Sequence, residues 1–387
     1  MPVRAVSSRR GGMTGTTVDN SHAVSRRVQR VADRVSSCLP WPRTTRNTCF
    51  FGLRATPGGP GYFSRKLAQE FHGQGMRVTH NRLRSAQSAL LFSVSWGDWF
   101  HRLCRLWGVR TVLRMDGFML PSYFDNRAQP HGFQKRALSP SAMRLNYRMQ
   151  RDLLWADHVV YQSVFCKEMA DTHLYNRRER YSIIHNGVNL DWFRPGLGHS
   201  GRLRLLAAGS LRHEYMLGTV LPVFARLWRS HDLELHVVGT LGRICRRQLA
   251  DFSHQNSEAS ERIKVVGAID NDDMPQQMRQ ADVLLHPRLG DWCPNVVVEA
   301  LACGLPVVCG SWGGASELVG AGGIAVPTEQ WSYGEEFLQG MATAVETVLA
   351  SLPDYRARAR QRAEAELDIS RVAEAYALAM GLRHACK

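Results

Sequence analysis

The sequence lacks any apolar run of the roughly 18 residues needed to span a bilayer. Its N-terminal part also lacks the apolar stretch that marks a secretory signal peptide. We therefore expect neither a membrane-spanning helix nor a secretory leader, and we expect the protein to be cytoplasmic or peripheral on the inner face of a membrane.

Paired cysteines are absent as well. The nine cysteines include no Cys-x-x-Cys pair and have no histidine partners at metal-binding spacing. This pattern argues against a zinc site or a disulfide framework, and an odd, scattered set of cysteines is typical of a reducing compartment. We therefore expect no bound metal.

Acidic residues are too few to balance the basic ones, and the formal net charge is +15. The excess is uneven, because residues 1–50 hold nine Arg and two Asp while the remaining 337 residues carry only +8. Positive charge fits nucleic acid, an anionic membrane or phosphate-bearing substrates. No nucleic-acid motif with interleaved aromatic residues accompanies it, so we expect no nucleic-acid partner and keep open a peripheral contact with an anionic membrane.

The first 47 residues form a segment of their own. Val24, Val28, Val31 and Val35 recur at helical spacing with arginines between them, which indicates a short basic amphipathic helix. Valine is a poor helix former and a weak membrane anchor. A disordered tail over residues 1–47, or an upstream extension of the reading frame, is therefore the favoured interpretation.

From residue 48 onward, short apolar runs alternate with helical patterns. This alternation predicts parallel sheets wrapped by helices, and 387 residues exceed what one core usually holds, so we expect an α/β protein with two Rossmann-like domains. In the second half we expect a helix from about residue 218 to 230, followed by further strands and helices. No strand pattern follows residue 335.

The segment 284–320 is the most informative part of the sequence about a possible ligand site. It contains a buried strand over 283–285, Pro294 at the first position of a helix over 295–303, and a strand over 307–309. Gly313 and Gly314 then open another helix, where backbone N–H groups can approach an anion closely.

Two acids give this segment its chemistry. Asp291 lies in the loop before the helix and Glu299 lies inside it, eight residues later. A carboxylate here can accept two hydroxyl hydrogen bonds, as a ribose diol requires, while nearby N–H groups bind phosphate or sugar oxygens. Alternatively, Asp291 caps the helix and Glu299 is a solvated acid in its first turns.

The spacing of these residues resembles the donor-binding region of the family-four retaining glycosyltransferases, which have the GT-B fold of two facing Rossmann-like domains. The matching residues are Asp291, Glu299, Gly304, Gly313-Gly314 and Glu317. The resemblance implies that Glu299 binds the nucleotide ribose. It also implies that Asp291, which replaces a more usual Glu, approaches the donor sugar with help from the backbone at Pro294, Asn295 and Val296.

A second match marks the domain boundary. The stretch 183–195, Ile-Ile-His-Asn-Gly-Val-Asn-Leu-Asp-Trp-Phe-Arg-Pro, resembles the family's interdomain hinge. We therefore predict an N-terminal acceptor domain over 48–197, a donor domain over 198–369, and a helix over 370–387 that crosses back onto the first domain, as the resemblance implies. Closure about a linker at 195–201 would assemble the cleft and exclude water.

In the first domain, Gly58, Gly59 and Gly61 resemble the loop that passes close to bound substrate, although a glycine-rich loop is more often only a tight turn. Asp116 follows a strand, at the edge where α/β sheets bind ligands. Relatives often carry a His near this point, and we nominate Asp116 in its place.

One departure from the family concerns the donor diphosphate. Relatives present an Arg and, five residues later, a Lys, whereas this chain has Ser210 and Tyr215. Arg212 and His213 are the nearby cationic candidates. Either Arg212 replaces the usual clamp, which we favour, or the activity has been lost and Arg212 is a solvated loop cation.

The sequence therefore predicts a retaining, metal-independent enzyme without a cofactor. It would move a sugar from a UDP- or GDP-linked donor to a hydroxyl of a glycan or lipid-linked acceptor, in cell-surface polysaccharide or glycoconjugate synthesis. The alternatives are another sugar enzyme with two Rossmann domains, such as an epimerase or an inverting transferase, and a non-catalytic subunit that binds nucleotide sugars.

Overall fold

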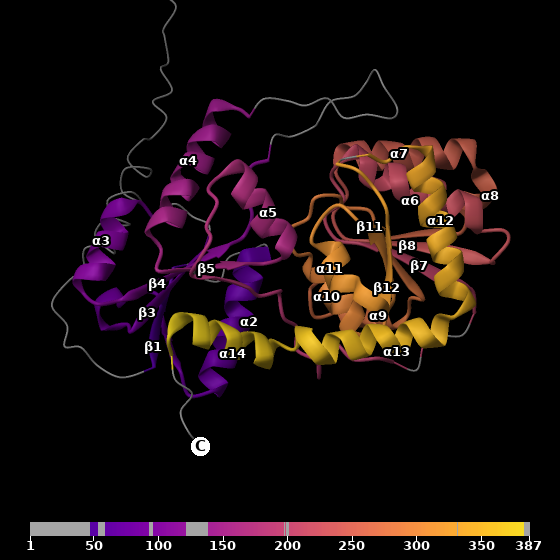
Figure 1. The fold of residues 1–387 in the computed structure, drawn as a ribbon. Coiled ribbons are helices and arrows are strands. Elements are labelled where there is room, and N and C mark those ends of the chain that lie inside the picture. The colour runs from indigo at the N-terminus through magenta and orange to yellow at the C-terminus, as the bar shows by residue number, and fades with distance from the viewer. Residues whose placement is uncertain are drawn as a thin grey trace, which may run out of the picture.

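The computed structural model describes residues 47–52, 59–92, 96–120, 138–196, 198, 201–330 and 332–382. The predicted helix over 24–35, the tail and Gly58 lie outside these residues. Two lobes stand side by side, each built on one parallel sheet (Figure 1). The predicted α/β class is confirmed.

The first lobe contains a six-stranded parallel sheet in the order β2-β1-β3-β4-β5-β6. Most of its strands are short apolar runs without charged residues, as expected when helices cover both faces. Its elements are β1 (Thr48–Phe51), α2 (Gly59–Gly73), β2 (Arg77–Thr79), β3 (Ser88–Phe92), α3 (Asp98–Leu106), β4 (Arg110–Met115), α4 (Pro140–Trp155), β5 (His158–Tyr161), α5 (Val164–His173) and β6 (Tyr181–Ile183).

The second lobe repeats this plan with the order β12-β11-β10-β7-β8-β9. Because the order reverses beside β7, the loops that leave β7 and β10 diverge there and leave room for a ligand. Its elements are β7 (Leu203–Ala208), α6 (Glu214–Leu227), β8 (Leu233–Val238), α7 (Arg243–Gln255), α8 (Ser257–Ser260), β9 (Ile263–Gly267), α9 (Met274–Arg279), β10 (Val283–His286), α10 (Asn295–Ala302), β11 (Val307–Gly310), α11 (Ala315–Val319) and β12 (Gly323–Val326).

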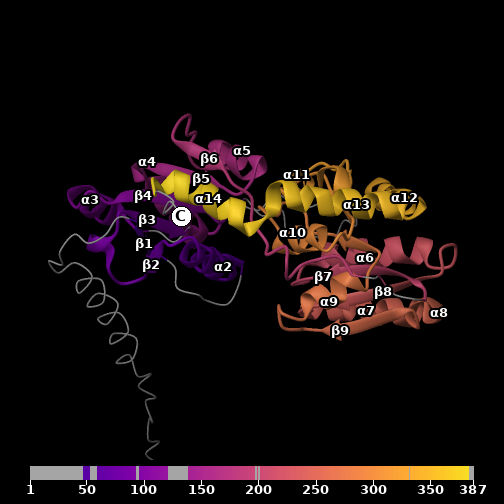
Figure 2. The same ribbon diagram turned by 90° about the horizontal axis from the view of Figure 1, so that it is seen from below.

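Three helices complete the chain: α12 (Glu335–Ala350), α13 (Leu352–Arg362) and α14 (Ile369–Met380). The α13–α14 segment runs along the bottom of both lobes, and α14 lies on the first sheet (Figures 1 and 2). Val372, Tyr376 and Met380 of α14 are buried in one core cluster with Phe63 and Phe71 of α2. The predicted crossing of the last helix back to the first lobe is confirmed.

The chain returns to the first lobe beside the hinge. The backbone N–H of Val188 donates to Leu367 at 2.8 Å, and the N–H of Ile369 donates back to Val188 at 3.0 Å. A Cβ on Gly187 would lie 2.9 Å from the Cα of Ile369, so this crossing requires a glycine at 187.

One expected helix start is wrong. Helix α6 begins at Glu214 rather than near residue 218, because Tyr215, Met216 and Leu217 pack into the core and stabilise an earlier first turn. Helix α10 begins at Asn295 as expected, and Pro294 is the residue before its first turn, with an extended backbone and a ψ of 118°.

Candidate functional site

The predicted donor residues gather at the carboxyl ends of three neighbouring strands. β10 pairs with β7 on one side and with β11 on the other. The loop after β7 carries Ser210, Arg212 and His213, the loop after β10 carries Asp291, and the loop after β11 carries Gly313-Gly314. These loops meet where the strand order reverses, which is where open α/β sheets bind ligands.

The acid loop and the glycine loop are tied together through their backbones. The N–H of Gly314 donates to the carbonyl of Asp291 at 2.7 Å, and that of Gly290 donates to Trp312 at 2.9 Å. A Cβ on Gly314 would lie 2.1 Å from the carbonyl oxygen of Trp292, and Gly313 has a φ of +137°. Both positions therefore require glycine. The expectation that the Gly314 N–H faces a phosphate is wrong, because Asp291 accepts its hydrogen bond.

The carboxylate of Asp291 lies beside a cation that the sequence analysis missed. Its Oδ2 is 3.3 Å from Nε of Arg288, three residues earlier in the same loop. Burial lowers the pKa of His213, and the charges of Arg288 and Arg212 lower it further. The charges of Arg288 and Arg212 therefore both reach His213, and Arg288 adds a cation to the Arg212 and His213 that the sequence suggested.

The position where relatives carry a lysine has become part of the core. Tyr215 is 2% exposed and belongs to the second lobe's main apolar cluster. The ring of His213 stacks on it, with centroids 5.8 Å apart. Arg212 itself is exposed, and its Cα packs against Gly242 of the loop after β8, where a Cβ would lie only 2.9 Å away. The buried Tyr215 thus anchors the loop through its contact with His213. The side chain of Arg212 in the same loop is exposed to solvent.

Glu299 is not a solvated acid, because it is only 8% exposed. Burial raises its pKa to about 7, against the opposing charge of Lys66. Lys66 belongs to α2 of the first lobe and donates to the carbonyl of Gly187 at 2.9 Å. Burial lowers the pKa of Lys66, and Glu299 opposes that shift. The predicted ribose ligand therefore faces a cation from the opposite lobe.

The start of α2 approaches the start of α10. A Cβ on Gly59 would lie 3.8 Å from Nδ2 of Asn295, and Gly61, two residues later, is buried. The first N–H groups of a helix have no acceptor within the helix, so Asn295 and Val296 present theirs toward this approach. In α10, the N–H of Val297 already donates to Pro294 at 3.1 Å.

Asp116 lies in a buried polar cluster of the first lobe. It forms an ion pair with Arg114, whose side chain is 1% exposed. Nη2 of Arg114 also donates to Oδ1 of Asn186 at 2.7 Å and to Oε1 of Gln162 at 3.1 Å, and its Nε donates to the hydroxyl of Tyr376 at 3.1 Å. Asp116 is thus held by a cation that also anchors the hinge and the last helix.

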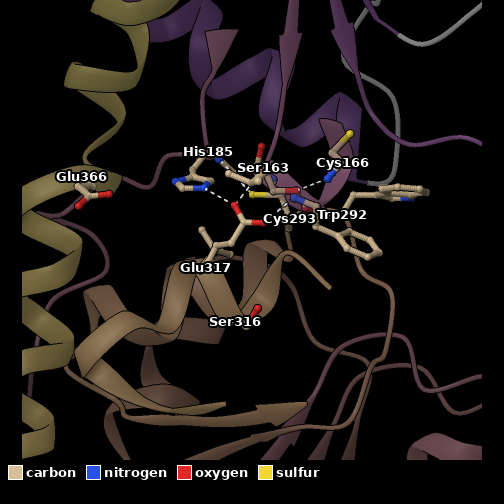
Figure 3. Close-up of polar contacts among 12 residues, drawn as sticks. Ser163, Cys166, His185, Trp292, Cys293, Ser316, Glu317 and Glu366 are labelled. Carbon is tan, nitrogen blue, oxygen red and sulfur yellow. Dashed lines mark hydrogen bonds and ion pairs between the residues drawn. The ribbon is translucent and has the colours of Figure 1, made fainter. Parts of the chain in front are cut away.

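The two lobes meet through a set of hydrogen bonds shown in Figure 3. Ser163 donates to the carbonyl of Trp292 at 2.7 Å. The carboxylate of Glu317 accepts from the N–H groups of Val164 and Phe165, both at 2.7 Å, and lies 3.4 Å from Nε2 of His185. Glu317, named above only as part of a motif, therefore caps helix α5 of the opposite lobe.

The side chain of Trp292 reinforces this junction. Its ring lies 4.8 Å from that of Phe118 and 5.6 Å from that of Phe165. A Cβ on Gly117 would lie 2.2 Å from the indole nitrogen, and Gly117 has a φ of +110°. The residue next to Asp291 is therefore packed directly against the loop that carries Asp116.

Within the described ranges, no group of three His, Cys, Asp or Glu side chains is arranged to hold a metal ion. None of the helices in the same ranges is long and apolar enough to cross a bilayer. The seven cysteines that the structure describes are all free and buried.

Comparison with known proteins supports this geometry. A family model described as "Glycosyl transferases group 1" matches residues 202–350. This part of the chain is therefore similar to the group 1 glycosyl transferases. The matched residues contain β7 to β12 and every donor-side residue discussed above.

Curated relatives of the group 1 domain are distant. The chain is 21% identical over 204 residues to the phosphatidylinositol N-acetylglucosaminyltransferase gpi3 subunit of Schizosaccharomyces pombe, covering 52% of this chain and 42% of that protein. It is 29% identical to the D-inositol 3-phosphate glycosyltransferase 1 of Catenulispora acidiphila, covering 39% of this chain and 40% of that protein. The matches thus span about two fifths of the length of these relatives.

Solved structures similar to this one extend over both lobes. Sucrose-phosphate synthase from Thermosynechococcus elongatus aligns with a TM-score of 0.68 at 16% identity, covering 86% of this chain and 98% of that one. Anabaena HepE in complex with UDP and glucose aligns with a TM-score of 0.61 at 15% identity, covering 87% and 100%. The predicted GT-B fold, with two facing Rossmann-like domains, is confirmed.

Proposed function

We propose that this protein is a retaining glycosyltransferase that uses a nucleotide diphosphate sugar and no metal ion. One observation carries the proposal: Asp291, Glu299 and the Gly313-Gly314 turn come together at the strand-order reversal of a group 1 domain, facing the other lobe. Such a cleft can hold a nucleotide in one lobe and present its sugar to an acceptor on the other.

In this proposal each donor group has its own residues. Glu299 accepts the two ribose hydroxyls, Asp291 contacts the sugar, and Arg212 stabilises the diphosphate as it departs. The N–H groups of Asn295 and Val296 at the start of α10 supply further donors to phosphate or sugar oxygens. No enzymatic nucleophile is required, because positioning and charge stabilisation lower the barrier.

The donor base is proposed from the solved relatives. HepE has been crystallised with UDP-glucose, and that structure aligns over 87% of this chain with a TM-score of 0.63. A UDP-linked sugar is therefore our first choice and a GDP-linked sugar the second. Acceptors named for relatives include phosphatidylinositol and inositol 3-phosphate. We propose a lipid-linked or glycan hydroxyl as the acceptor here, in the assembly of a cell-surface polysaccharide or glycoconjugate at the inner face of a membrane.

A thermal-shift screen against UDP- and GDP-linked sugars tests donor binding, since a ligand that binds only the folded state raises its apparent stability. The bound donor is then offered to acceptors in buffer containing EDTA, and the anomeric configuration of the product is read by NMR. Retention with EDTA present supports the proposal. An inverted product, an epimerised donor or a requirement for a divalent cation would contradict it.

A non-catalytic role is favoured by one observation, the buried Tyr215 where relatives present a lysine. In that case the protein would bind a nucleotide sugar for a partner enzyme. The two functions separate in a single experiment, because a binding subunit would give a donor-dependent thermal shift without transfer or donor hydrolysis across an acceptor panel. Hydrolysis of the bound donor alone would already indicate a working leaving-group site.

A further inference from the structure

Helices α3 and α4 carry a basic surface that glycosyl transfer does not explain. The two helices lie at the outer side of the first lobe (Figure 1). Their exposed residues combine arginines with large apolar and aromatic side chains. The exposed members are Trp99, Arg102, Arg105, Leu106, Met143, Arg144, Tyr147, Arg148 and Leu154, and we call this set the α3–α4 face.

The face is one continuous surface because its side chains interlock across the two helices. The guanidinium groups of Arg102 and Arg105 on α3 lie 5.3 Å and 5.0 Å from the ring of Trp155 on α4. In addition, α4 contributes a cation to α3, because Arg151 of α4 forms an ion pair with Asp98 of α3. Stacking of Arg on aromatic rings leaves the outer side of each guanidinium free to bind anions.

Acids are nearly absent from the two helices. Helices α3 and α4, both fully described, contain only Asp98 and Asp152. Asp98 is paired with Arg151, and Asp152 is buried, where it accepts hydrogen bonds from the N–H groups of Trp96 and Gly97. The α3–α4 face therefore presents uncompensated positive charge.

Apolar exposure accompanies this charge. Leu106 at the end of α3 is 77% exposed, and Met143, Leu145 and Leu154 of α4 are also exposed. Exposed aliphatic side chains add nothing to the binding of nucleic acid, whose outer surface is phosphate. Arginines with interspersed Trp, Tyr and Leu instead match the interfacial zone of a bilayer.

A hollow beside this surface extends the positive charge. It has a volume of about 490 Å³ and is lined by Arg105, Arg110 and Arg180, with Asp157 as the one acid. Asp157 already accepts hydrogen bonds from the N–H and hydroxyl of Thr111, both at 2.8 Å. The hollow therefore offers its guanidinium groups to an anion.

The α3–α4 face is also connected to the proposed active site. Asn146, on the buried side of α4, holds the backbone of Met119 by two hydrogen bonds, at 2.7 Å and 3.0 Å. Met119 is exposed, and its neighbour Phe118 packs against Trp292 beside Asp291. The buried side of α4 is thus linked, through Met119 and Phe118, to the loop that carries Asp291.

We propose that the α3–α4 face docks the protein onto a membrane rich in anionic lipid, with the arginines at the headgroups and Leu106, Met143 and Leu154 below them. The proposal rests on the proposed transfer reaction only in suggesting why a lipid-linked acceptor would reach the cleft. Docking itself requires neither donor nor acceptor. It can therefore succeed or fail independently of the enzyme assay.

The test is sedimentation of the full chain with sucrose-loaded vesicles of phosphatidylcholine, with and without phosphatidylglycerol. We expect binding to the anionic vesicles only, weakened by salt. Arg144→Gln/Arg148→Gln should lower the partition coefficient roughly 30-fold, because each basic residue at an anionic surface contributes about 1 kcal/mol. The matched control is Arg229→Gln/Arg358→Gln, which removes two exposed arginines from the second lobe and should bind as the unaltered protein does.

A second variant tests the apolar part. Leu106→Ser/Leu154→Ser changes only exposed residues and should weaken vesicle binding while leaving the unfolding temperature unchanged. Equal binding to neutral and anionic vesicles, or equal loss in the two arginine double variants, would overturn the proposal. So would binding of RNA by the α3–α4 arginines with no vesicle binding. Donor-induced thermal shifts, measured in parallel, report on the transferase proposal separately.

Discussion

The carboxylate of Glu317 accepts a hydrogen bond from the backbone N–H of Phe165 at 2.7 Å, across the boundary between the two lobes. Glu317 belongs to the helix that follows the glycine turn of the donor site, and Phe165 belongs to the first turn of α5. One side chain therefore couples the donor loops of the second lobe to a helix of the first. Figure 3 shows this contact, which would hold the two lobes together when the cleft is closed.

Glu317→Gln should loosen this contact. An amide oxygen can replace only one of the two carboxylate oxygens that accept from Val164 and Phe165, and a hydrogen bond to a charged group contributes about 1.5 to 3 kcal/mol. We expect amide hydrogen exchange at residues 164–166 to accelerate about 10-fold or more. Glu366→Gln, which alters an exposed acid of the crossing segment, should leave that exchange unchanged.

Lowering the pH should weaken this contact, as the Glu317→Gln substitution does. Burial would raise the pKa of Glu317, but hydrogen bonds from His185 and from the N–H groups of Phe165 and Val164 outweigh it and hold the pKa below its usual value. A lowered pKa means that the contact is complete above the ordinary pKa of a Glu and is lost as pH falls through the lowered one. Protection from exchange at 164–166, measured relative to the intrinsic exchange rate at each pH, that stays high at the acid end would argue against this assignment.

Arg212→Ala tests the proposed replacement for the diphosphate clamp. Loss of one positioned donor to a leaving group costs on the order of 3 kcal/mol of barrier, so turnover should fall about 100-fold. The control is Arg358→Ala, an exposed arginine of α13. Unchanged turnover in Arg212→Ala would remove Arg212 from the mechanism.

Arg288 calls for a separate measurement, because it lies between Asp291 and the loop of His213. If Arg212 and Arg288 stabilise the same departing diphosphate, the double alanine variant should lose less than the product of the two single losses. Strictly multiplicative losses would show that the two cations act on different groups.

Glu299→Gln should weaken donor binding by about 1 to 3 kcal/mol, because a neutral amide replaces a carboxylate as acceptor of the ribose hydroxyls. Since burial raises the pKa of Glu299 to about 7, donor affinity of the unaltered protein should rise as pH increases through that value. Affinity in the Gln variant should be nearly independent of pH there. Isothermal titration across this range measures both effects, and unchanged donor affinity in the variant would show that the ribose binds elsewhere.

As pH increases, folding stability should fall, whereas donor affinity should rise. A carboxyl group with a raised pKa binds more protons when folded than when unfolded, so its contribution is greatest below 4.5 and declines as pH rises through about 7. Urea unfolding should show this decline for the unaltered protein and a smaller one for Glu299→Gln. Equal pH dependence in the two proteins would contradict the burial of an ionisable group at 299.

Arg114→Met tests the buried cluster behind the hinge. Removing the cation breaks its ion pair with Asp116, and breaking a buried ion pair typically costs about 3 to 5 kcal/mol. Urea denaturation should show this loss. Arg114→Met/Asp116→Asn should recover part of it, because no uncompensated charge remains. A double variant no more stable than the single one would mean that the contacts of Arg114 to Asn186 and Tyr376 dominate.

The sequence predicted strands because parallel-sheet strands are short, mostly apolar runs that repeat in order. The start of α6 was missed because Gly218 suggests a boundary, whereas burial of Tyr215 and Leu217 stabilises the preceding turn. Propensity alone could not reveal that packing.

The predicted donor residues meet in the structure because they follow neighbouring strands. Lys66, Arg288 and Trp292 were missed for different reasons. Lys66 faces Glu299 only because the lobes are juxtaposed, and Trp292 packs on Phe118 for the same reason. Arg288 belongs to the segment 284–320 and lies three residues before Asp291. That short spacing between a cation and an acid could have indicated the ion pair.

The crossing helix α14 also affects the order in which the chain is made. Tyr376 completes the buried surroundings of Arg114, yet 262 residues separate them. During synthesis on the ribosome, the core of the first lobe stays incomplete until α14, at the end of the chain, emerges. All strands of the second lobe are synthesised before that point. Domains usually fold in the order of synthesis, but here the lobe made first should be the last to become stable, and it would be the part most dependent on chaperones.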